Sequence, residues 1–418
     1  MIQGKGSTTQ ALTIEDVRAV LSQALASLSL TGKRVLVIIP DGTRTAPIPL
    51  LFRLLYEQIG RQVARLDYLI ALGTHQPMSA EAITKLVGAS AAERAEYYPN
   101  VQVYNHHWAD PSALQTIGVI SPSEAERLTE GILAEEVPVT LNRMIFDYDQ
   151  LIICGPVFPH EVAGFSGGAK YLFPGIAGSK IIDFSHWLGA RVTNMATIGV
   201  KDTLTRRVIH RAAEFVPQPL LCISLVLKGD TFHGIYTGSY IEAFECAADL
   251  SAQLNIIFKA RSFQRVLSLP SSIYDDLWTA AKAMYKTEPV IADGGEVIIY
   301  APHLTEVSYT HGELIDQVGY HVRDYFLKQW DRFQTVPGSI LAHSTHVKGS
   351  GSYDSRTRVE TPRIQVTLAT GIPQARCERI NLGYADYHTI DPHEWENRED
   401  EGILLVPHAG EMLYRLAP

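Results

Sequence analysis

"QLIICGPVFPHEVAGFSGGAKYLFPGIAG", residues 150–178, joins an apolar run to a loop rich in glycine. The run has the length of a strand, and a strand that is apolar at successive positions is typical of a sheet covered on both faces. A glycine loop after a strand often binds an anion through its backbone N–H groups. This loop also carries a histidine before its glycines and a lysine after them. It therefore predicts a functional site at the end of a buried strand.

Similar apolar runs recur along the chain and predict further strands, at residues 34–40, 66–73, 222–229, 296–302, 339–346 and 402–410. Segments with helical periodicity lie between them, for example at 13–28 and 49–63. Buried strands that alternate with helices predict the α/β class with largely parallel sheets. The length of 418 residues allows more than one domain.

We expect two α/β domains, an N-terminal one over residues 1–268 and a C-terminal one over residues 269–418, with the active site in the cleft between them. The first domain is expected to carry the cofactor and the catalytic histidines. The C-terminal segment can cross back to the first domain.

Composition narrows the class of protein. The net charge of −9 argues against a general binder of nucleic acid or of anionic membranes. The four cysteines are widely spaced and form no CxxC pair, which is typical of reduced thiols in a cytosolic protein. The chain has no run of about 18 apolar residues and does not open on a signal-peptide pattern. We therefore expect a cytoplasmic protein with no nucleic-acid or membrane partner.

Polar side chains follow three of the predicted strands. They are Asp41, Thr43 and Arg44 after the first, Thr74, His75 and Gln76 after the second, and His160, Ser166 and Lys170 in the glycine loop. Ligands of open α/β sheets bind beyond the carboxyl ends of the strands. A fourth candidate is Lys282, in the predicted helix 273–286.

Each candidate also has a structural interpretation when it is taken alone. Asp41 and Arg44 are compatible with an ion pair in a loop, His75 with a structural histidine and Lys282 with a solvated helix face. The occurrence of three such groups at strand ends favours a functional site. The loop is not a Walker A motif, because Ala169 precedes Lys170 and Tyr171 follows it. A lysine in such a loop can instead be a covalent anchor, because a desolvated amine loses its proton more readily.

Several motifs together resemble the lactate racemase family of nickel-pincer nucleotide enzymes. They are "PDGTRTAP" (40–47), "ALGTHQP" (71–77), the long loop at 159–178 and "DLWTAAKAM" (276–284), in the family's order. The resemblance implies an isomerase, a racemase or epimerase of 2-hydroxy acids. It implies a pyridinium-3-thioamide-5-thiocarboxylic acid mononucleotide that holds Ni, and cofactor-biosynthesis proteins as partners.

The resemblance also assigns roles to residues. His75 and His160 would be the catalytic acid/base pair, Lys170 would tether the cofactor, and His186 would be the metal ligand. The other positions would bind cofactor or substrate: Asp41, Thr43, Ser166, Gly167 and Gly168 for the cofactor, and Arg44, Lys282, Trp278 and Thr279 for the substrate.

The chemistry of the family suits these residue types. Three pincer donors leave one in-plane position on a square-planar nickel, which one imidazole can fill. Racemisation must break a Cα–H bond, and transfer of hydride to a cofactor gives a planar 2-keto acid that can be reduced on either face. Two histidines then allow each enantiomer its own base.

One departure bears on the substrate, and two other classes of protein stay open. The lactate enzyme of the family looks to have a "YQ" pair where this chain has Trp278 and Thr279. We therefore expect acids bulkier than lactate. One alternative is a pyridoxal-phosphate enzyme with Lys170 as its Schiff base. The other is a non-catalytic protein that binds an organic acid.

Overall fold

The computed structural model describes residues 2–417, which form two compact units. Within the described residues, the first unit comprises 2–158, 165–182 and 201–254, and the second comprises 159–164, 183–200 and 255–417. The predicted boundary at 268/269 falls within strand β13 (Phe263–Pro270) of the second unit. As a division into independently folding domains, that boundary stays a prediction.

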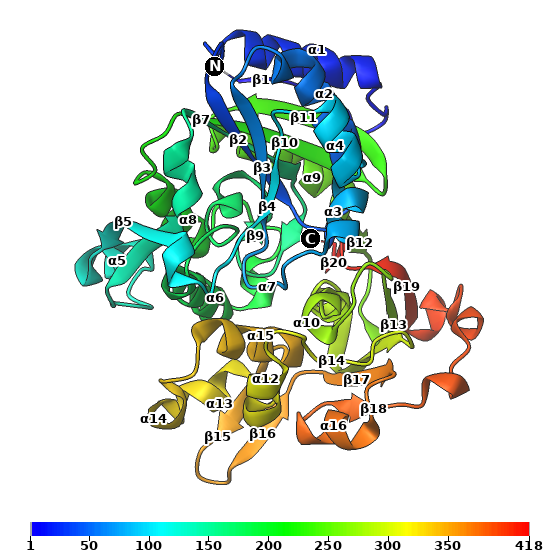
Figure 1. Cartoon of the computed structure of the whole chain (residues 1–418). Coiled ribbons are helices and arrows are strands. Elements are labelled where there is room, and N and C mark those ends of the chain that lie inside the picture. The colour runs from blue at the N-terminus through cyan, green and yellow to red at the C-terminus, as the bar shows by residue number, and fades with distance from the viewer. Residues whose placement is uncertain (1, 418) are drawn as a thin grey trace. The chain divides into compact units, whose positions relative to one another are not determined.

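A seven-stranded sheet forms the centre of the first unit, in the order β1-β11-β10-β7-β2-β3-β4 (Figure 1). The strands from β10 to β4 are parallel, and β11 is antiparallel to both of its neighbours. Their bounds are β1 (Gln3–Gly6), β2 (Arg34–Pro40), β3 (Arg65–Ala71), β4 (Val103–Asn105), β7 (Gln150–Pro156), β10 (Leu220–Lys228) and β11 (Thr231–Gly238). A separate hairpin pairs β5 (Leu114–Ile120) with β6 (Val137–Asn142).

The predicted strands at 34–40, 66–73, 150–158 and 222–229 correspond to β2, β3, β7 and β10. Residues 35–40 of β2 and every residue of β7 are buried, because these strands are covered on both faces. The prediction of an α/β fold with largely parallel sheets is therefore confirmed for this unit.

Helix α1 (Ile14–Ala26) illustrates how the sequence sets these elements. Thr13 and Asp16 form a capping box at its start, in which each side chain accepts a hydrogen bond from the other residue's backbone N–H. Its buried residues recur at helical spacing and pack into the core that also contains β2 and β3. The remaining helices of the unit are α2 (Ile48–Leu55), α3 (Ala80–Val87), α4 (Ala91–Tyr97), α5 (Pro122–Leu128), α8 (Leu204–Ala213) and α9 (Glu242–Asn255).

The second unit is built on a five-stranded, fully parallel sheet in the order β18-β17-β14-β13-β19. Besides β13, these strands are β14 (Ile291–Ala301), β17 (Gln365–Thr370), β18 (Gly383–Tyr384) and β19 (Ile403–Ala409). Two small sheets pair β12 (Ile256–Lys259) with β20 (Leu413–Leu416) and β15 (Gly351–Asp354) with β16 (Val359–Pro362). The C-terminal strand therefore pairs with a segment that precedes β13 in the chain.

Most helices of the second unit are short. They are α7 (Asn194–Thr197), α10 (Leu277–Ala280), α11 (Lys282–Tyr285), α12 (Gly312–Val318), α13 (Arg323–Leu327), α14 (Trp330–Phe333), α15 (Gly338–Lys348) and α16 (Gln374–Arg379). Helix α6 (Ser179–Val192) belongs to this unit from Asp183 onward. The helix predicted at 273–286 is present as two single turns, α10 and α11.

The strand predicted at 339–346 is wrong, because this segment lies in helix α15. Every residue from Ser339 to Val347 in the helix is buried. A helix buried on all sides has no polar face, so the hydrophobic pattern does not distinguish it from a buried strand.

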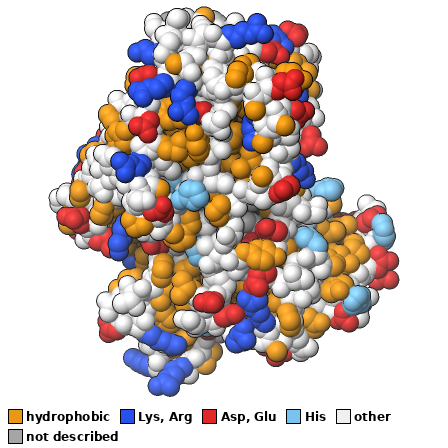
Figure 2. Space-filling view, in the orientation of Figure 1, with side chains coloured by type: hydrophobic (Ala, Val, Ile, Leu, Met, Phe, Trp, Pro, Cys, Tyr) orange, Lys and Arg blue, Asp and Glu red, His pale blue; other side chains and the backbone are white. Residues whose placement is uncertain are grey.

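The surface carries both signs of charge. Figure 2 shows acidic and basic side chains interspersed over the face drawn. None of the helices described for residues 2–417 is long and apolar enough to cross a membrane.

Candidate functional site

The carboxyl ends of β7, β2 and β3 meet at one edge of the first unit's sheet, because the three strands are adjacent and parallel. Asp41 follows β2 directly and is buried, with only 6 % of its surface exposed. Its Oδ1 accepts hydrogen bonds from the backbone N–H and the hydroxyl of Thr43, at 3.1 and 2.6 Å. This is an Asx turn, which fixes the direction of the carboxylate.

The other carboxylate oxygen of Asp41 contacts His75, which follows β3. The distance from His75 Nδ1 to Asp41 Oδ2 is 2.5 Å. Because a carboxylate only accepts, Nδ1 carries the proton and Nε2 of the neutral ring keeps its lone pair. Burial alone would raise the pKa of Asp41, but His75, by its charge when protonated and by its hydrogen bond, together with Arg44 and Thr43, holds that pKa below its usual value. Asp41 is thus an anion that orients a base.

Arg44 completes this group of residues. Its Nη1 donates to the carbonyl oxygen of Thr43 at 3.1 Å. Arg44 and Asp41 also lie close enough to Tyr171 of the glycine loop to influence its pKa, which burial raises. The first motif and the glycine loop are therefore neighbours.

A backbone hydrogen bond joins the loop to the segment before His75: Gly73 N–H donates to the carbonyl oxygen of Gly175 at 2.8 Å. The structure thus brings together Asp41, Arg44, His75 and the loop that carries Lys170. The positions of these groups after neighbouring predicted strands had placed them at one sheet edge.

The glycines of the loop are required by space and by backbone conformation. Gly167 has φ +90°, and a Cβ on it would lie 2.5 Å from Val157 Cγ2. Gly168 has φ +60°, and its Cβ would lie 2.9 Å from the carbonyl oxygen of Tyr240. A side chain at either position would therefore be strained and would also clash. Lys170 follows in a short 3-10 turn (Gly168–Tyr171) and is half-buried.

Ser166 connects the loop to the strand that precedes it. Its hydroxyl accepts from Phe158 N–H at 2.9 Å and donates to the carbonyl oxygen of Pro156 at 3.1 Å. The hydroxyl therefore shapes the loop as it leaves β7.

Sequence reasoning missed Arg206, which lies in α8 with 2 % of its surface exposed. Its guanidinium donates to the carbonyl oxygens of Gly167, at 3.0 Å, and Phe165, and stacks over the ring of Phe244 at 3.9 Å. Burial lowers its pKa to about 9. Arg206 thus holds two loop carbonyls on one side, but nothing in its sequence neighbourhood marks it.

The remaining predicted residues lie in the second unit. His160, with 5 % of its surface exposed, accepts a hydrogen bond at Nδ1 from Val162 N–H, at 3.1 Å. A neutral ring then carries its proton on Nε2, so His160 is arranged as a donor where His75 is arranged as a base. Glu161 Oε2 lies 3.5 Å from the same Nδ1.

The segment with Trp278, Thr279 and Lys282 is held by Asp276. The Thr279 hydroxyl bonds to Asp276 Oδ1 at 2.9 Å, and Thr279 N–H donates to the same oxygen at 3.0 Å. Lys282 is buried, donates to the carbonyl oxygen of Thr279 at 3.0 Å, and has its Nζ 4.5 Å from the centre of the Tyr274 ring. Both polar groups are therefore ordered by local contacts.

Trp278 stacks on His343 of α15, with ring centres 4.0 Å apart and planes at 13°. His343 Nε2 also donates to the carbonyl oxygen of Trp278 at 3.1 Å, and burial lowers the pKa of His343 to about 3. His346, one turn further along the helix, is close enough to His186 to affect its own pKa, which burial lowers to about 4. The wrong strand assignment concealed both histidines; a helical reading places them three residues apart on one face.

The described residues contain no cluster of three or more His, Cys, Asp or Glu side chains that could hold a metal ion. A metal bound by protein side chains alone therefore lacks a donor set in residues 2–417. A cofactor that brings its own donors and needs a single imidazole is compatible with that finding.

Comparisons with known proteins agree with the motifs. Residues 5–199 match the family model described as the lactate racemase N-terminal domain. Two proteins named lactate racemase, from Lactiplantibacillus plantarum and Thermoanaerobacterium thermosaccharolyticum, are 25 % and 24 % identical to the chain over 289 and 288 residues. A solved structure from Thermotoga maritima, a structural genomics target, is 31 % identical and superposes with a TM-score of 0.91. These matches support assignment of the chain to the lactate racemase family.

The extent of these matches differs. The alignments with the two curated relatives cover 67 % of this chain and 62 % of each relative. The Thermotoga maritima structure is matched over 99 % of this chain and 100 % of its own. The lactate racemase apoprotein of Thermoanaerobacterium thermosaccharolyticum has the same fold, with a TM-score of 0.70 at 19 % identity over 99 % of this chain and 94 % of its own.

Proposed function

We propose that this member of the family is a 2-hydroxy acid racemase or epimerase that works with a lysine-tethered nickel-pincer nucleotide. The observation that carries the proposal is the Asp41–His75 pair, at 2.5 Å, beside the glycine loop that ends in Lys170. Family membership and the names of the relatives support the same class of reaction.

His75 is proposed as the general base. Its Nδ1–H is held by Asp41, so Nε2 can accept the proton of the substrate hydroxyl. Asp41 stays ionised, because its pKa lies below its usual value, and stabilises the imidazolium that forms. The same imidazolium can return the proton to the oxygen at the end of the reaction.

His160 is proposed as the second catalytic histidine. With Val162 N–H on Nδ1, its neutral ring presents Nε2–H and can hydrogen-bond an oxygen that gains negative charge. To act as a base at Nε2, the neutral ring must instead carry its proton on Nδ1. Glu161 Oε2 can then accept a hydrogen bond from Nδ1–H. We therefore propose that His75 removes the hydroxyl proton of one enantiomer. For the other enantiomer, His160 is the proposed base, and Glu161 stabilises the tautomer that it needs.

Arg44 and Lys282 are proposed to bind substrate carboxylate. A guanidinium can do so through two parallel N–H groups, and an ammonium acts as a point charge. Trp278, stacked on His343, is proposed as an apolar wall that favours acids bulkier than lactate, with the short side chain of Thr279 beside it.

The residues present fit the proposed cofactor by the chemistry of their donors. Lys170 supplies an amine for the tether from the glycine loop, and Asp41, Thr43, Ser166, Gly167 and Gly168 are the proposed contacts of the nucleotide or of the loop that holds it. His186 is the proposed imidazole for nickel. When bound, the nucleotide would supply a hydride acceptor, which makes a planar 2-keto acid the intermediate of racemisation.

Intact-mass spectrometry tests the proposal on protein produced together with cofactor-biosynthesis proteins, which are its proposed partners. We expect a covalent adduct of the nucleotide's mass that is absent from Lys170→Ala, and bound nickel that is lost from His186→Ala while the adduct remains. An adduct trapped by borohydride would instead identify a pyridoxal-phosphate enzyme. A chain that binds 2-hydroxy acids with no adduct and no turnover would be a binding protein.

A further inference from the structure

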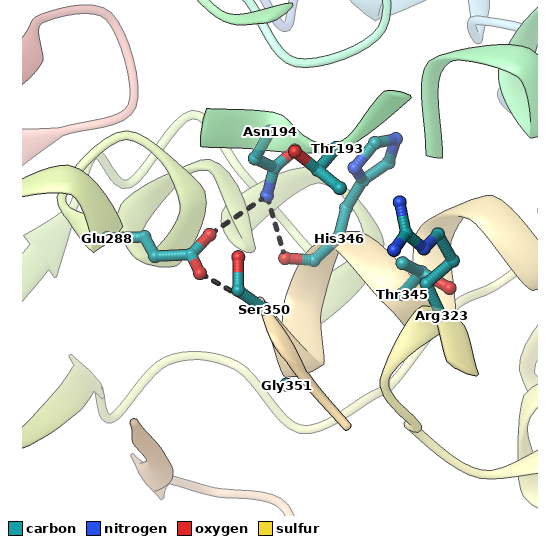
Figure 3. Close-up of a pocket in the computed structure, with 9 residues that line it drawn as sticks. Thr193, Asn194, Glu288, Arg323, Thr345, His346, Ser350 and Gly351 are labelled. Carbon is teal, nitrogen blue, oxygen red and sulfur yellow. Dashed lines mark hydrogen bonds between the residues drawn. The ribbon is translucent and has the colours of Figure 1, made fainter. Parts of the chain in front are cut away.

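A polar cavity lies in the second unit, between α7, α13 and the end of α15 (Figure 3). Its volume is about 80 Å³. The residues that matter are Asn194, Glu288, Arg323, Thr345, His346 and Ser350. About 10–15 Å³ of such space is enough for one water molecule, so the cavity has room for a ligand of several non-hydrogen atoms.

Buried polar atoms around this cavity lack hydrogen-bond partners within residues 2–417. They are Asn194 Oδ1, Thr345 Oγ1, Arg323 Nε and both ring nitrogens of His346. Asn194, Thr345 and His346 are themselves 4 %, 5 % and 3 % exposed. A buried polar group without a partner costs about 1–3 kcal/mol, so a concentration of them indicates a missing ligand.

The contacts of Asn194 determine which of its atoms faces the cavity. Its Nδ2 donates to the carbonyl oxygen of His346 at 3.1 Å and to Glu288 Oε2 at 3.4 Å, as the dashed lines in Figure 3 show. The amide oxygen is therefore the atom left to accept a hydrogen bond. The unpartnered set thus contains donors, from Arg323, Thr345 and one His346 nitrogen, and acceptors, from Asn194 and the other His346 nitrogen.

Two charged side chains line the cavity, Glu288 and Arg323. Glu288 already has partners, because its Oε1 accepts from Ser350 N–H at 2.8 Å and lies 3.8 Å from Arg363 Nη2, although Arg363 also pairs with Asp293 at 3.1 Å. On the other side, Arg323 and Lys328 share one carboxylate, that of Asp324, at 3.6 and 3.5 Å.

Arg191 adds a further positive charge beside Arg323. Burial and then the charge of Arg323 lower the pKa of Arg191, and no carboxylate of the described chain forms an ion pair with it. The Nη1 of Arg323 is held by the carbonyl oxygen of Arg191 at 2.9 Å, which fixes the guanidinium at the cavity. Arg191 and Arg323 are therefore neighbouring cations, and Arg323 is the one that lines the cavity.

We propose that this cavity binds a small oxyanion that also carries an O–H donor, such as a short 2-hydroxy carboxylate or hydrogen phosphate. The oxyanion would accept from Arg323 Nε and the Thr345 hydroxyl, and the O–H group would donate to Asn194 Oδ1 or to His346. The cavity adjoins the proposed cofactor residues at His346, which lies close enough to His186 and Glu161 for their charges to affect its pKa. Arg323, Thr345 and Asn194 have no role in the proposed reaction, and the binding test does not depend on turnover.

Titration calorimetry on the full chain tests the site with four probes: glycolate, acetate, inorganic phosphate and sulfate. We expect glycolate or phosphate to bind more tightly than acetate and sulfate at neutral pH, because only the first two carry an O–H donor. Tighter binding of glycolate would identify a hydroxy acid as the ligand, and tighter binding of phosphate would identify phosphate. Failure of all four to bind would overturn the proposal.

Two variants locate the binding. Arg323→Gln removes the charge, and Thr345→Val removes only an unpartnered hydroxyl at nearly constant shape, so it is expected to be at least as stable as the wild type. Each should weaken binding by about ten-fold or more. Arg356→Gln, which removes an exposed charge from the turn after β15, should leave affinity unchanged.

Glycolate is itself a 2-hydroxy acid and can also bind at the proposed substrate residues. Binding there would persist unchanged in Thr345→Val and Arg323→Gln, and that result would overturn the proposal. A crystal soaked in the tighter probe should show it against Arg323 and Asn194; ordered water alone at this position would overturn it as well.

Discussion

The two carboxylate oxygens of Asp41 have different partners. One oxygen is bound by Thr43 within the turn, and the other orients the imidazole. An asparagine can keep the turn, because its Oδ1 also accepts, but its other terminus would be an NH₂ donor directed at His75 Nδ1. The imidazole would then favour the tautomer with its proton on Nε2, which is not a base.

Asp41→Asn should therefore lower the racemisation rate by about 10²- to 10⁴-fold, the contribution typical of a positioned base. The measurement is kcat by chiral chromatography of the product, with circular dichroism to verify the fold. Asp110→Asn is the matched control, since Asp110 accepts from Ser112 N–H and Oγ in the same kind of turn without a histidine. Equal rates for wild type and Asp41→Asn would exclude the assigned role.

The same carboxylate predicts how stability depends on pH. The folded-state pKa of Asp41 is lower than its ordinary value of 3.8, so the ionised group stabilises the fold above that value, and this contribution is lost as pH falls below it. Urea unfolding at pH 6, 4 and 3 should show a steeper loss of unfolding free energy for wild type than for Asp41→Asn. Parallel losses would mean that the pair contributes nothing in this window.

Trp278 leads to a prediction about substrate size. Its indole is held by stacking on His343 and contacts His311 at 4.5 Å between ring centres, so it forms a fixed wall. One buried methylene is worth about 0.8 kcal/mol, so two or three extra groups can raise kcat/KM about ten-fold or more. A panel of lactate, 2-hydroxybutyrate, 2-hydroxyisovalerate, phenyllactate and malate checks this. Preference for lactate over every bulkier acid would refute it.

At the scale of elements, the glycine loop depends on the absence of a side chain. Gly167→Ala would combine a positive φ with a Cβ 2.5 Å from Val157 Cγ2. Gly32→Ala is a control for φ alone, because Gly32 has φ +73° and no atom within 4 Å of its Cβ position. Both should lose about 1–2 kcal/mol of unfolding free energy through φ, and Gly167→Ala about 1–3 kcal/mol more through the clash. Chemical denaturation measures the difference in unfolding free energy. Equal losses would show that the loop shifts and relieves the clash.

The elements that the sequence predicted best are those whose pattern reports burial directly. The strand at 34–40 is reproduced residue for residue, since a fully covered strand reads as an unbroken apolar run. β13 was missed as a strand because Gln264, Arg265 and Ser268 interrupt its apolar pattern, although it is an interior strand of its sheet, between β14 and β19. Helix α15 was misread because it is buried on every side.

The candidate site was predictable to the extent that it follows strand ends in the chain. Asp41, His75 and the glycine loop could be expected together, because parallel neighbouring strands share an edge. Arg206 could not, since it comes from a helix elsewhere in the chain and acts on backbone carbonyls, which leave no trace in sequence. The ties of Thr279 to Asp276 were likewise invisible before the local fold was known.

The whole molecule is not a simple succession of two segments, because the chain passes several times between its compact units. Residues 183–200 belong to the second unit and make specific contacts there. Asp183 accepts from Ser339 N–H and Oγ at 3.0 and 2.7 Å, and Trp187 stacks on Trp330 at 5.8 Å between ring centres.

A fragment of residues 255–418 keeps the five-stranded sheet but loses these contacts. We expect it to bind a hydrophobic dye and to unfold without a cooperative transition, whereas the full chain unfolds cooperatively. Dye fluorescence and urea titration measure both properties. Adding a peptide of residues 183–200 should restore part of the cooperativity; a fragment that unfolds sharply by itself would show that the interleaved segment is dispensable.

The pairing of β1 with β11 has a consequence for translation. The first strand leaves the ribosome long before residues 231–238 exist, and at about 5–20 residues per second it waits roughly ten seconds or more for its partner. An unpaired edge is an aggregation hazard in a nascent chain, most of all when it is apolar. The strand that waits is short, rich in glycine and carries Lys5, and three of its four residues are exposed even in the finished fold. Strand β1 therefore waits longest for its partner in this sheet, and its composition gives it a low tendency to aggregate while it is unpaired.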